Sequence, residues 1–461
     1  MCGHICNRRC EEVCTRGSID RAVAIDEVKK FIAMQDLNSE TRYIPPKVIP
    51  RVQGEFEEKI AIIGAGPAGL SCAYYLAEKG YRPTVFDRNE KPGGMLVYGI
   101  PSYKPEKDVI DAEIDIIRQL GVEFRCGVEV GKDVTIEELR KQGYKAFYIA
   151  IGCQGGRSVG VKGEDGPGVI SAVDFLREIN AREAYDFKGD VVVIGGGNVA
   201  IDCSRDAVRA GTEHVYQYSL ETQETMPASA DEIEEALEDG VVLNGGWGPK
   251  EILRDDSGAV NGIVLKRCVS VKDKEGRFRP QYDENETVTV PCATVVLAVG
   301  QSIVWGDLLK GTNVKLGGGM GALCDPVTYQ TDQPDIFAGG DVYTGPKFVI
   351  DAIAAGKEAA ISLHRFVQPH TSLTIGRNPN YYRELDKDDI HVESYDNSSR
   401  QIPGTDHAKK LSFRDAIHLQ RDNPECSTMR KSEDKLKYVL PYGMKQAIKV
   451  RFKNKKEPDW R

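Results

Sequence analysis

Two stretches of the chain share one pattern, in which a short, continuous apolar run precedes an amphipathic segment and a second apolar run. In the first stretch, residues 59–63 are apolar, residues 68–79 have helical periodicity, and residues 84–86 are apolar again. The corresponding ranges of the second stretch are 191–194, 198–209 and 214–218. Continuous apolar strands that alternate with helices predict parallel sheets covered on both faces.

Weaker patterns lie outside these two stretches. A helical pattern covers about 19–34, and a proline-rich connector at 44–50 separates it from the first apolar run. After residue 273 the pattern becomes β-type, including 294–299, and a further helix is predicted at 349–366.

A glycine-rich turn joins the strand and the helix of the first stretch. It has the spacing G-x-G-x-x-G, and its residues are Gly64, Ala65, Gly66, Pro67, Ala68 and Gly69. The glycines permit a tight turn and a close approach of the backbone to a pyrophosphate, which the helix N-terminus attracts. Asp87 ends the next strand, where a carboxylate accepts hydrogen bonds from a ribose. An incidental turn is the alternative, and the flanking strand, helix and carboxylate argue against it.

The second stretch has its own glycine-rich turn, with the spacing G-x-G-x-x-A. Its residues are Gly195, Gly196, Gly197, Asn198, Val199 and Ala200. Alanine replaces the third glycine, whose packing role tolerates the change. Two such turns predict one nucleotide for each domain. A single turn would not separate NAD from FAD, whereas the pair favours a nicotinamide–flavin enzyme.

The two turns predict an α/β fold with two Rossmann-like dinucleotide-binding domains. The FAD-binding domain is expected to be discontinuous, over 51–165 and 295–368, because the NAD(P)-binding domain at 166–294 is inserted into it. A short cysteine-rich helical segment and its linker are expected at 1–50. The polar, weakly periodic residues 369–461 predict an extension that docks on the surface or on a partner.

Composition limits the classes of function. The formal net charge is −9, and no basic composition indicates a general nucleic-acid binder. No apolar run approaches the roughly 18 residues that span a bilayer. The polar, cysteine-rich N-terminus does not have the pattern of a secretory signal. A cytoplasmic protein without a membrane span is therefore expected.

Four of the 12 cysteines fall in the first fourteen residues: Cys2, Cys6, Cys10 and Cys14. The others are scattered, mostly in apolar surroundings typical of reduced core thiols. On one continuous helix, residues 2–14 would extend about 18 Å, too far for one metal centre, so a shared site requires this segment to coil. Four thiolates suit either a [4Fe–4S] cluster or a closed zinc site, and a cytosolic disulfide is less favourable.

These features together resemble the glutamate synthase small-subunit family, flavoproteins that pass electrons from a nicotinamide to an iron–sulfur relay. The resemblance extends from about Cys2 to Leu363. The motifs that carry it are PGGMLVYGIP at 92–101, GGGNVAID at 195–202, MPA at 226–228, FAGGD at 337–341 and TGP at 344–346. As a set they are far more specific than either glycine turn alone.

The resemblance implies roles for residues outside the two turns. The family's flavin-contacting segment corresponds here to Gly93, Gly94, Met95 and Leu96. Asp341, after Gly340, is implied to hydrogen-bond the ribityl chain of FAD. The helix that follows is implied to direct its N-terminus at the flavin pyrimidine, where it would stabilise negative charge. Without the resemblance, Gly340 and Asp341 would be interpreted as a plain turn.

The chain departs from the family pattern after the second glycine turn. The family's strand there usually ends in paired arginines that hold the 2′-phosphate of NADPH, whereas this chain has Tyr218, Ser219, Leu220 and Glu221. Loss of two cations removes the contacts that select a phosphate. Glu221 would repel a phosphate and accept a hydrogen bond from a free 2′-hydroxyl. NADH is therefore expected over NADPH, and an idle site with a solvated Glu221 is the alternative.

The resemblance also bears on the N-terminal cysteines. Family members have a longer N-terminal domain with cysteines for two iron–sulfur clusters. Cys6, Cys10 and Cys14 match the cysteines that remain here, and Cys2 is an additional candidate ligand. Together they imply a [4Fe–4S] cluster, with zinc as the competing prediction. A partner subunit is a candidate to provide the missing half of the domain.

The sequence thus predicts a flavoprotein subunit that passes electrons between NAD(H) and an iron–sulfur partner subunit or ferredoxin through FAD. A hetero-oligomer is expected, with an electron-bifurcating assembly among the candidates. Hydride transfer requires stacked rings and not a dedicated acid or base, so no catalytic residue is named. No C-x-x-C pair accompanies the flavin segment, which argues against a disulfide reductase. The alternatives are a relay subunit with a decayed nicotinamide site and a glutamate synthase small subunit.

Overall fold

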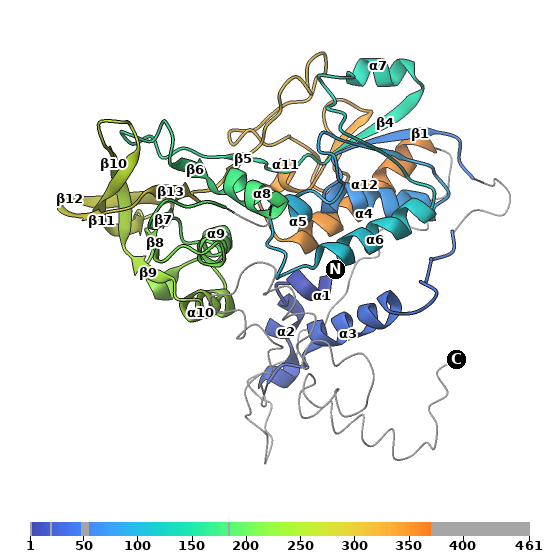
Figure 1. Cartoon of the computed structure of the whole chain (residues 1–461). Helices are drawn as coiled ribbons and strands as arrows, with labels where there is room; N and C mark the ends of the chain where they lie inside the picture. The colour runs from blue at the N-terminus through green and yellow to red at the C-terminus, as the bar shows by residue number, and fades with distance from the viewer. Residues whose placement is uncertain (1, 19–20, 48–54, 183–184, 370–461) are drawn as a thin grey trace, which may run out of the picture.

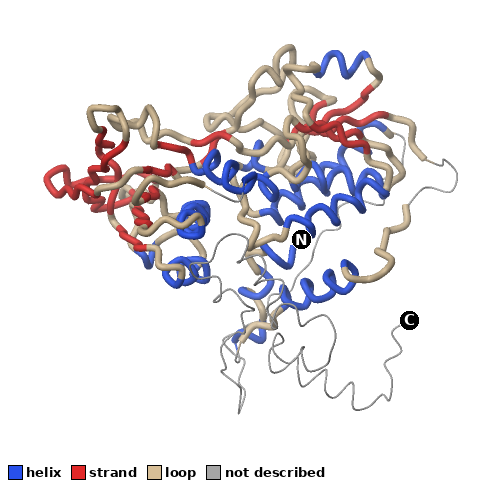
Figure 2. Tube along the Cα trace, in the orientation of Figure 1, coloured by secondary structure: helices blue, strands red, loops and turns tan. Residues whose placement is uncertain are grey.

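The computed structural model describes residues 2–18, 21–47, 55–182 and 185–369. The predicted extension at 369–461 lies outside the described residues, except for residue 369. The described chain forms two α/β units, with a helical N-terminal segment beside them (Figure 1). The strands gather in two groups, one for each unit (Figure 2).

The first unit is built on a five-stranded parallel sheet in the order β15-β4-β1-β2-β3. Its strands are β1 Lys59–Ile63, β2 Thr84–Asp87, β3 Glu123–Cys126, β4 Tyr144–Ile149 and β15 Ile336–Ala338. Because β15 follows the whole second unit along the chain, the first unit contains residues from both sides of the second.

Alternating side chains of β1 explain why both faces of this sheet are covered. Ile60 and Ile62 contribute to one buried cluster, while Ala61 and Ile63 contribute to another, because successive strand residues point to opposite faces. The first face packs against the helices α4 Pro67–Glu78, α6 Lys107–Gln119 and α12 Val349–Val367. The opposite face is covered in part by α7, Ile136–Lys141.

The second unit is also built on a five-stranded parallel sheet, in the order β6-β13-β7-β8-β9. Its strands are β6 Val169–Ser171, β7 Val191–Ile194, β8 Val215–Ser219, β9 Val242–Gly245 and β13 Thr294–Leu297. Val191 and Val193 pack against helices on one face. These helices are α8 Ala172–Arg182, α9 Asn198–Arg209 and α10 Ala230–Glu238.

A three-stranded antiparallel sheet covers the other face of the second unit. It consists of β10 Trp247–Arg254, β11 Val260–Lys272 and β12 Phe278–Val290. Val192 and Ile194 pack against its buried side chains, among them Ile263 and Leu265. The β-type pattern predicted after residue 273 corresponds to β12 and β13, but the three strands from Val242 to Lys272 were not predicted. Register shifts along β10 and β11 break the alternation of apolar and polar residues that would have indicated these strands.

The N-terminal segment contains four short or medium helices: α1 Cys2–Ile5, α2 Arg9–Glu12, the 3₁₀ turn η1 Thr15–Ser18 and α3 Ile25–Leu37. α1 contacts α3 and also α12 of the first unit, and the segment lies below the junction of the two units (Figure 1). The predicted helix at 19–34 was misplaced, because residues 21–24 are not helical. Asp26 and Glu27 stand in the first turn of α3, where acidic residues favour a helix N-terminus.

Two chain connections join the units. Their short strands β5 Gly155–Gly156 and β14 Gln301–Ser302 pair antiparallel. The predicted domain boundary between residues 294 and 295 falls inside β13, which pairs with β6 and β7. We therefore propose that the inserted unit extends at least to Leu297.

Candidate functional site

A cavity of about 990 Å³ lies between the two units and the N-terminal segment. Its volume is at the upper end of the roughly 300–1,000 Å³ typical of ligand and cofactor sites. Predicted site residues that line it come from both glycine turns and from the loops after β2 and β15: Gly64, Gly66, Pro67, Ala68, Asp87, Gly94, Met95, Gly197, Asn198, Val199, Gly340 and Asp341. Cys6 of the N-terminal segment also lines it. The structure thus places both turns at one cavity.

The first glycine turn has two kinds of glycine. A Cβ on Gly64 would overlap the carbonyl oxygen of Ala150, and Gly64 has a φ of +108°. A Cβ on Gly69 would overlap the carbonyl oxygen of Gly64 itself. Gly66 is different, since its nearest neighbour would be the Cα of Gly94 at 3.9 Å. Gly64 and Gly69 are thus required by packing, whereas Gly66 keeps open the space in front of α4.

Asp87 holds this turn in place from the end of β2. Its Oδ2 accepts a hydrogen bond from the backbone N–H of Ala65 at 2.7 Å. Its Oδ1 accepts from the backbone and side-chain nitrogens of Asn89, at 2.8 and 2.9 Å. The carboxylate is buried yet lines the cavity. Because each oxygen has more than one lone pair, acceptor capacity remains for a ligand hydroxyl.

The segment predicted to contact a flavin lies directly against the first turn. The backbone N–H of Gly93 donates to the carbonyl of Ala65 at 2.8 Å, and Gly93 and Gly94 both have positive φ angles. The short helix α5, Met95–Tyr98, follows. Gly94 and Met95 line the cavity, whereas Leu96 is buried in the core of the first unit. Leu96 therefore supports the segment from behind.

Gly340 and Asp341 join β15 to the short helix α11, Asp341–Thr344. A Cβ on Gly340 would lie 2.9 Å from the Cβ of Ala68, so glycine allows β15 to approach α4. The Asp341 carboxylate accepts a long hydrogen bond of 3.3 Å from the backbone N–H of Lys347. Burial raises the pKa of Asp341 to about 6. An incompletely paired carboxyl beside the cavity suits a ligand hydroxyl.

The N-terminus of α12 also faces the cavity. Phe348 and Val349 line it, as Pro67 does at the start of α4. A Cβ on Gly356 of α12 would overlap the carbonyl oxygen of Ala68, which shows how closely the two helices cross. Two helix N-termini are thus directed at one space, and both favour negative charge on a ligand.

The second glycine turn repeats the design of the first. A Cβ on Gly195 would overlap the carbonyl oxygen of Ala298, and Gly195 has a φ of +149°. Gly197 has no atom within 4 Å of where its Cβ would stand. The Asn198 side chain accepts from the backbone N–H of Ser229 at 2.9 Å, which closes the turn. Ala200 is buried, in keeping with the packing role of the third glycine position.

Some predicted residues do not line the cavity themselves: Gly69, Gly93, Leu96, Gly195, Ala200, Glu221, Cys2, Cys10 and Cys14. Glu221 follows β8 and is half-buried, with its Oε2 2.9 Å from where a Cβ on Gly196 would stand. Its backbone carbonyl accepts from the Ser219 hydroxyl at 2.8 Å. The carboxylate therefore stands beside the second turn, at the end of the neighbouring strand.

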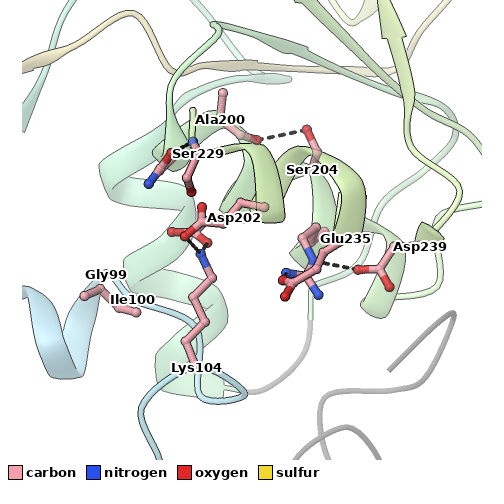
Figure 3. A network of polar contacts seen from close by, with 12 residues as sticks. Gly99, Ile100, Lys104, Ala200, Asp202, Ser204, Ser229, Glu235 and Asp239 are labelled. Atoms are coloured by element: carbon pink, nitrogen blue, oxygen red, sulfur yellow. Dashed lines mark hydrogen bonds and ion pairs between the residues drawn. The ribbon is translucent and has the colours of Figure 1, made fainter. Parts of the chain in front are cut away.

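A polar network between the units was not predicted (Figure 3). Lys104, which follows the segment predicted to contact a flavin, pairs with Asp202 of α9 at 2.5 Å and with Glu232 of α10 at 2.9 Å. The Lys104 side chain is only 15% exposed. Burial alone would lower its pKa, but the two carboxylates outweigh burial and hold the pKa above its ordinary value. Lys104, Asp202 and Glu232 all line the cavity.

The network continues into the second unit. Arg205 donates to Asp239 at 2.7 Å and also pairs with Glu235, and Arg209 donates to Asp239 at 2.5 Å (Figure 3). Both arginines lie on α9, Glu235 lies on α10 and Asp239 directly follows α10, so these charges fix the two helices together. Helical periodicity had indicated an amphipathic α9, but no sequence signal paired its polar side with Lys104.

The N-terminal cysteines occupy a segment that is not one helix. Arg8 has a φ of +56° and separates α1 from α2, so the segment coils as a shared metal site requires. Cys6 accepts a hydrogen bond from Lys29 at 3.5 Å, and Cys10 is exposed. Among the described residues, no three His, Cys, Asp or Glu side chains are arranged to hold a metal ion. The thiols suit a metal chemically, but their arrangement does not yet form a site.

Two adjacent arginines hold this segment across the cavity. Arg8 pairs with Asp231 of α10 at 2.7 Å. Arg9 donates to both carboxylate oxygens of Asp351 in α12, at 2.7 and 2.9 Å. One arginine thus contacts each unit, and Cys6 lies where the segment borders the cavity.

The thiols near the first unit do not form a redox pair. Every cysteine in the described ranges is free. Cys153 donates to the backbone carbonyl of Asp341 at 3.6 Å, and burial raises its pKa to about 12. Such a thiol stays protonated and unreactive. Within the same ranges, no helix combines the length and the apolar character needed to cross a bilayer.

Residues 58–356 match the model of the pyridine nucleotide-disulphide oxidoreductase family. The beta subunit of an NADP(+)-dependent formate dehydrogenase from Moorella thermoacetica is 36% identical, over 83% of this chain and 56% of that subunit. The glutamate synthase [NADPH] small chain of Escherichia coli (strain K12) is 34% identical, over 80% of each chain.

Solved structures show the same fold at lower identity. Mycobacterium tuberculosis FprA in complex with NADPH has a TM-score of 0.58 and 20% identity, over 68% of this chain and 85% of that one. T. acidophilum thioredoxin reductase has a TM-score of 0.53 and 20% identity, over 68% of this chain and all of that one. The predicted fold of two Rossmann-like units is confirmed. The chain belongs to the pyridine nucleotide-disulphide oxidoreductase family, which implies FAD and NAD(P), and resembles glutamate synthase small chains and related beta subunits as its motifs predicted.

Proposed function

We propose that this chain is an electron-transfer flavoprotein subunit that takes electrons from NADH through FAD. The observation that carries the proposal is the shared cavity, onto which both glycine turns, Asp87 and Asp341 open. When bound, FAD accepts a hydride from a nicotinamide and releases electrons singly. The protein supplies position, exclusion of water and a fixed electrostatic environment.

The first unit is proposed to hold FAD. The turn formed by Gly64, Gly66, Pro67, Ala68 and Gly69 would carry the pyrophosphate at the N-terminus of α4. Asp87 would accept hydrogen bonds from the adenosine ribose, and Asp341 from the ribityl chain. Gly94 and Met95 would border the isoalloxazine, with Gly93, Leu96 and Gly340 shaping the backbone behind them. The N-terminus of α12 would stabilise negative charge on the reduced ring.

The second unit is proposed to hold the nicotinamide nucleotide. Its turn would carry the pyrophosphate through the free backbone N–H groups at Gly197, Asn198 and Val199, with Gly195 and Ala200 required for packing. Because this turn faces the same cavity as the first, the two nucleotides would enter one space, where the nicotinamide would stack on the isoalloxazine ring. No acid or base is needed for hydride transfer between stacked rings.

Selection of NADH over NADPH is proposed to rest on Glu221. The small chain from Escherichia coli is named as an NADPH protein, and the formate dehydrogenase subunit as an NADP(+) protein. In this chain a carboxylate stands beside Gly196, where it would repel a 2′-phosphate and accept from a 2′-hydroxyl.

Replacing Glu221 with serine should therefore narrow this preference. We expect the rate of flavin reduction at limiting NADH to fall about tenfold, the equivalent of one charged hydrogen bond, and the rate with NADPH to rise. Stopped-flow reduction of the FAD-loaded chain by each coenzyme measures both changes. Glu224→Ser, three residues along and exposed, is the matched control and should change neither. Equal effects of both variants would refute a specific role for Glu221.

The N-terminal cysteines are proposed to ligate a [4Fe–4S] cluster through which electrons leave to an iron–sulfur partner subunit or a ferredoxin. Support comes from four thiols in one coiled segment that two arginines hold beside the cavity. The free thiols suit a reducing cytoplasm, where we propose that a hetero-oligomer forms. Iron and acid-labile sulfide should accompany the anaerobically purified chain, and zinc without iron would contradict the proposal.

A relay subunit with a decayed nicotinamide site is the second candidate. It is favoured by the absence of paired arginines after β8, since no cationic side chain at the end of that strand would hold the 2′-phosphate of NADPH. Against it, the second turn retains the glycine with open space in front of its helix. Anaerobic reduction by NADH separates the two candidates.

A further inference from the structure

Arg177 extends from the second unit into the first. It lies on α8, and its guanidinium donates to side chains from two loops of the first unit. One nitrogen donates to Oδ1 of Asn89 at 2.7 Å, and the other donates to Oε1 of Gln154 at 2.9 Å. The guanidinium also lies 5.2 Å from the centre of the Tyr98 ring. One side chain therefore joins the loops after β2 and β4 to α5.

The contact with Asn89 fixes the direction of its amide group. The amide oxygen accepts from Arg177, so the amide nitrogen faces the other way and donates to Oδ1 of Asp87 at 2.9 Å. Without the guanidinium, the amide oxygen would lose its charged donor, and the Asn89 side chain would be held only by its bond to Asp87. The two hydrogen bonds thus connect Arg177 through Asn89 to Asp87.

The positive charge of Arg177 lies beside these two hydrogen bonds. In the part of the molecule that the structure describes, its hydrogen-bond acceptors are two neutral amide oxygens, and its other contact is the Tyr98 ring, so no carboxylate pairs with it directly. Asp87 is the nearby buried carboxylate, one residue beyond Asn89 in the network. A cationic donor strengthens the hydrogen bond to the Asn89 oxygen, and the polarised amide in turn strengthens the bond that its N–H donates to Asp87.

We propose that Arg177 is a positioning residue for the flavin nucleotide. Acting through Asn89, it holds the Asp87 carboxylate in the orientation that receives the adenosine ribose. This inference rests on the proposed binding of FAD by the first unit. Because Arg177 belongs to the inserted unit, the ribose site is complete only when the two units keep their present arrangement.

The test is the affinity of the full-length chain, stripped of flavin, for FAD and for ADP. ADP contains the adenosine ribose and pyrophosphate but no flavin. Arg177→Met should weaken both ligands by the same factor, about tenfold, as expected for one hydrogen bond with a charged donor. Arg177→Lys keeps the positive charge but cannot donate to both amide oxygens as the guanidinium does. Its affinity for each ligand should therefore lie between those of Arg177→Met and the parent chain. Arg182→Met, which removes an exposed charge from the same helix, is the control and should bind both ligands normally.

A double-mutant cycle separates positioning from general support of the fold. If Arg177 acts through Asn89, then Asn89→Ala combined with Arg177→Met should bind FAD no more weakly than the weaker single variant. Additive losses would overturn the inference, as would a loss of FAD affinity with unchanged ADP affinity. A parent chain that binds neither ligand would instead refute the proposed function. The thermal unfolding midpoint of each flavin-free variant shows whether the chain remains folded.

Discussion

Replacement of Gly66 with alanine should remove FAD from the chain while leaving the protein folded. Gly66 has a φ of −75° and a ψ of −179°, a conformation that alanine adopts freely. Its new methyl group would meet only the Cα of Gly94, at 3.9 Å, which is ordinary van der Waals contact. The same methyl group would fill the space that a pyrophosphate needs in front of α4. We expect FAD affinity to fall about a hundredfold, or about 2.7 kcal/mol.

The measurement is flavin content after purification, followed by the dissociation constant of added FAD. Circular dichroism of the flavin-free protein shows whether the fold is intact. Gly197→Ala is the reciprocal control, since its methyl group would have no protein atom within 4 Å. It should leave FAD content unchanged and should weaken NADH instead. If Gly66→Ala retained normal FAD affinity, the first turn would not carry the pyrophosphate.

Replacement of Lys104 with methionine should strongly destabilise the junction of the two units. The change leaves Asp202 and Glu232 facing each other without a cation, and their side chains are only 10% and 22% exposed. Removing one partner from a buried ion pair costs about 3–5 kcal/mol, and the partial exposure of Glu232 favours the lower end. Thermal unfolding of the parent and variant chains should show the difference.

The destabilisation should depend on pH in a defined direction. Burial raises the pKa of Glu232, and Lys104 partly opposes this, so loss of Lys104 should raise the pKa further. A carboxyl whose pKa is higher in the folded than in the unfolded state binds protons preferentially in the folded state, so stability falls as pH rises through that pKa. Lys104→Met should therefore be less destabilised at about pH 5 than at about pH 8.

Lys162→Met is the matched control for this prediction. Lys162 pairs with Glu251 at 2.6 Å, but its side chain is 82% exposed. Exposed ion pairs contribute about 0–1 kcal/mol, so this variant should unfold almost as the parent chain does. If Lys104→Met and Lys162→Met had similar unfolding midpoints, the ion pairs of Lys104 would contribute no more to stability than an exposed pair does.

The sequence predicted the two sheets and the two turns because their signals are local. Residues 191–194 are continuously apolar, and α9 begins and ends at the predicted residues, since a glycine turn and an amphipathic run define both limits. The resemblance then added Gly340 and Asp341, which no local pattern would have joined to the first turn. The structure places both beside the same cavity.

The features that were missed depend on contacts between distant residues. Lys104 and Asp202 are far apart in sequence, and neither residue type indicates its partner. Arg177 reaches Asn89 only because the inserted unit folds back against the first. β10 and β11 were missed because register shifts interrupt the alternation of apolar and polar residues along them. Four cysteines in fourteen residues predicted a metal site, but spacing alone did not determine whether their thiols converge.

Anaerobic titration of the FAD-loaded chain with NADH tests whether the nicotinamide bound at the second glycine turn reduces the flavin bound at the first. We expect the absorbance of the oxidised flavin to bleach as one equivalent of NADH is added for each FAD, and to bleach much more slowly with NADPH. The two glycine turns would then serve one reaction in one cavity. A flavin that stays oxidised in excess NADH and in excess NADPH would contradict the proposed function, because a nicotinamide bound at the second turn would then not reduce the flavin.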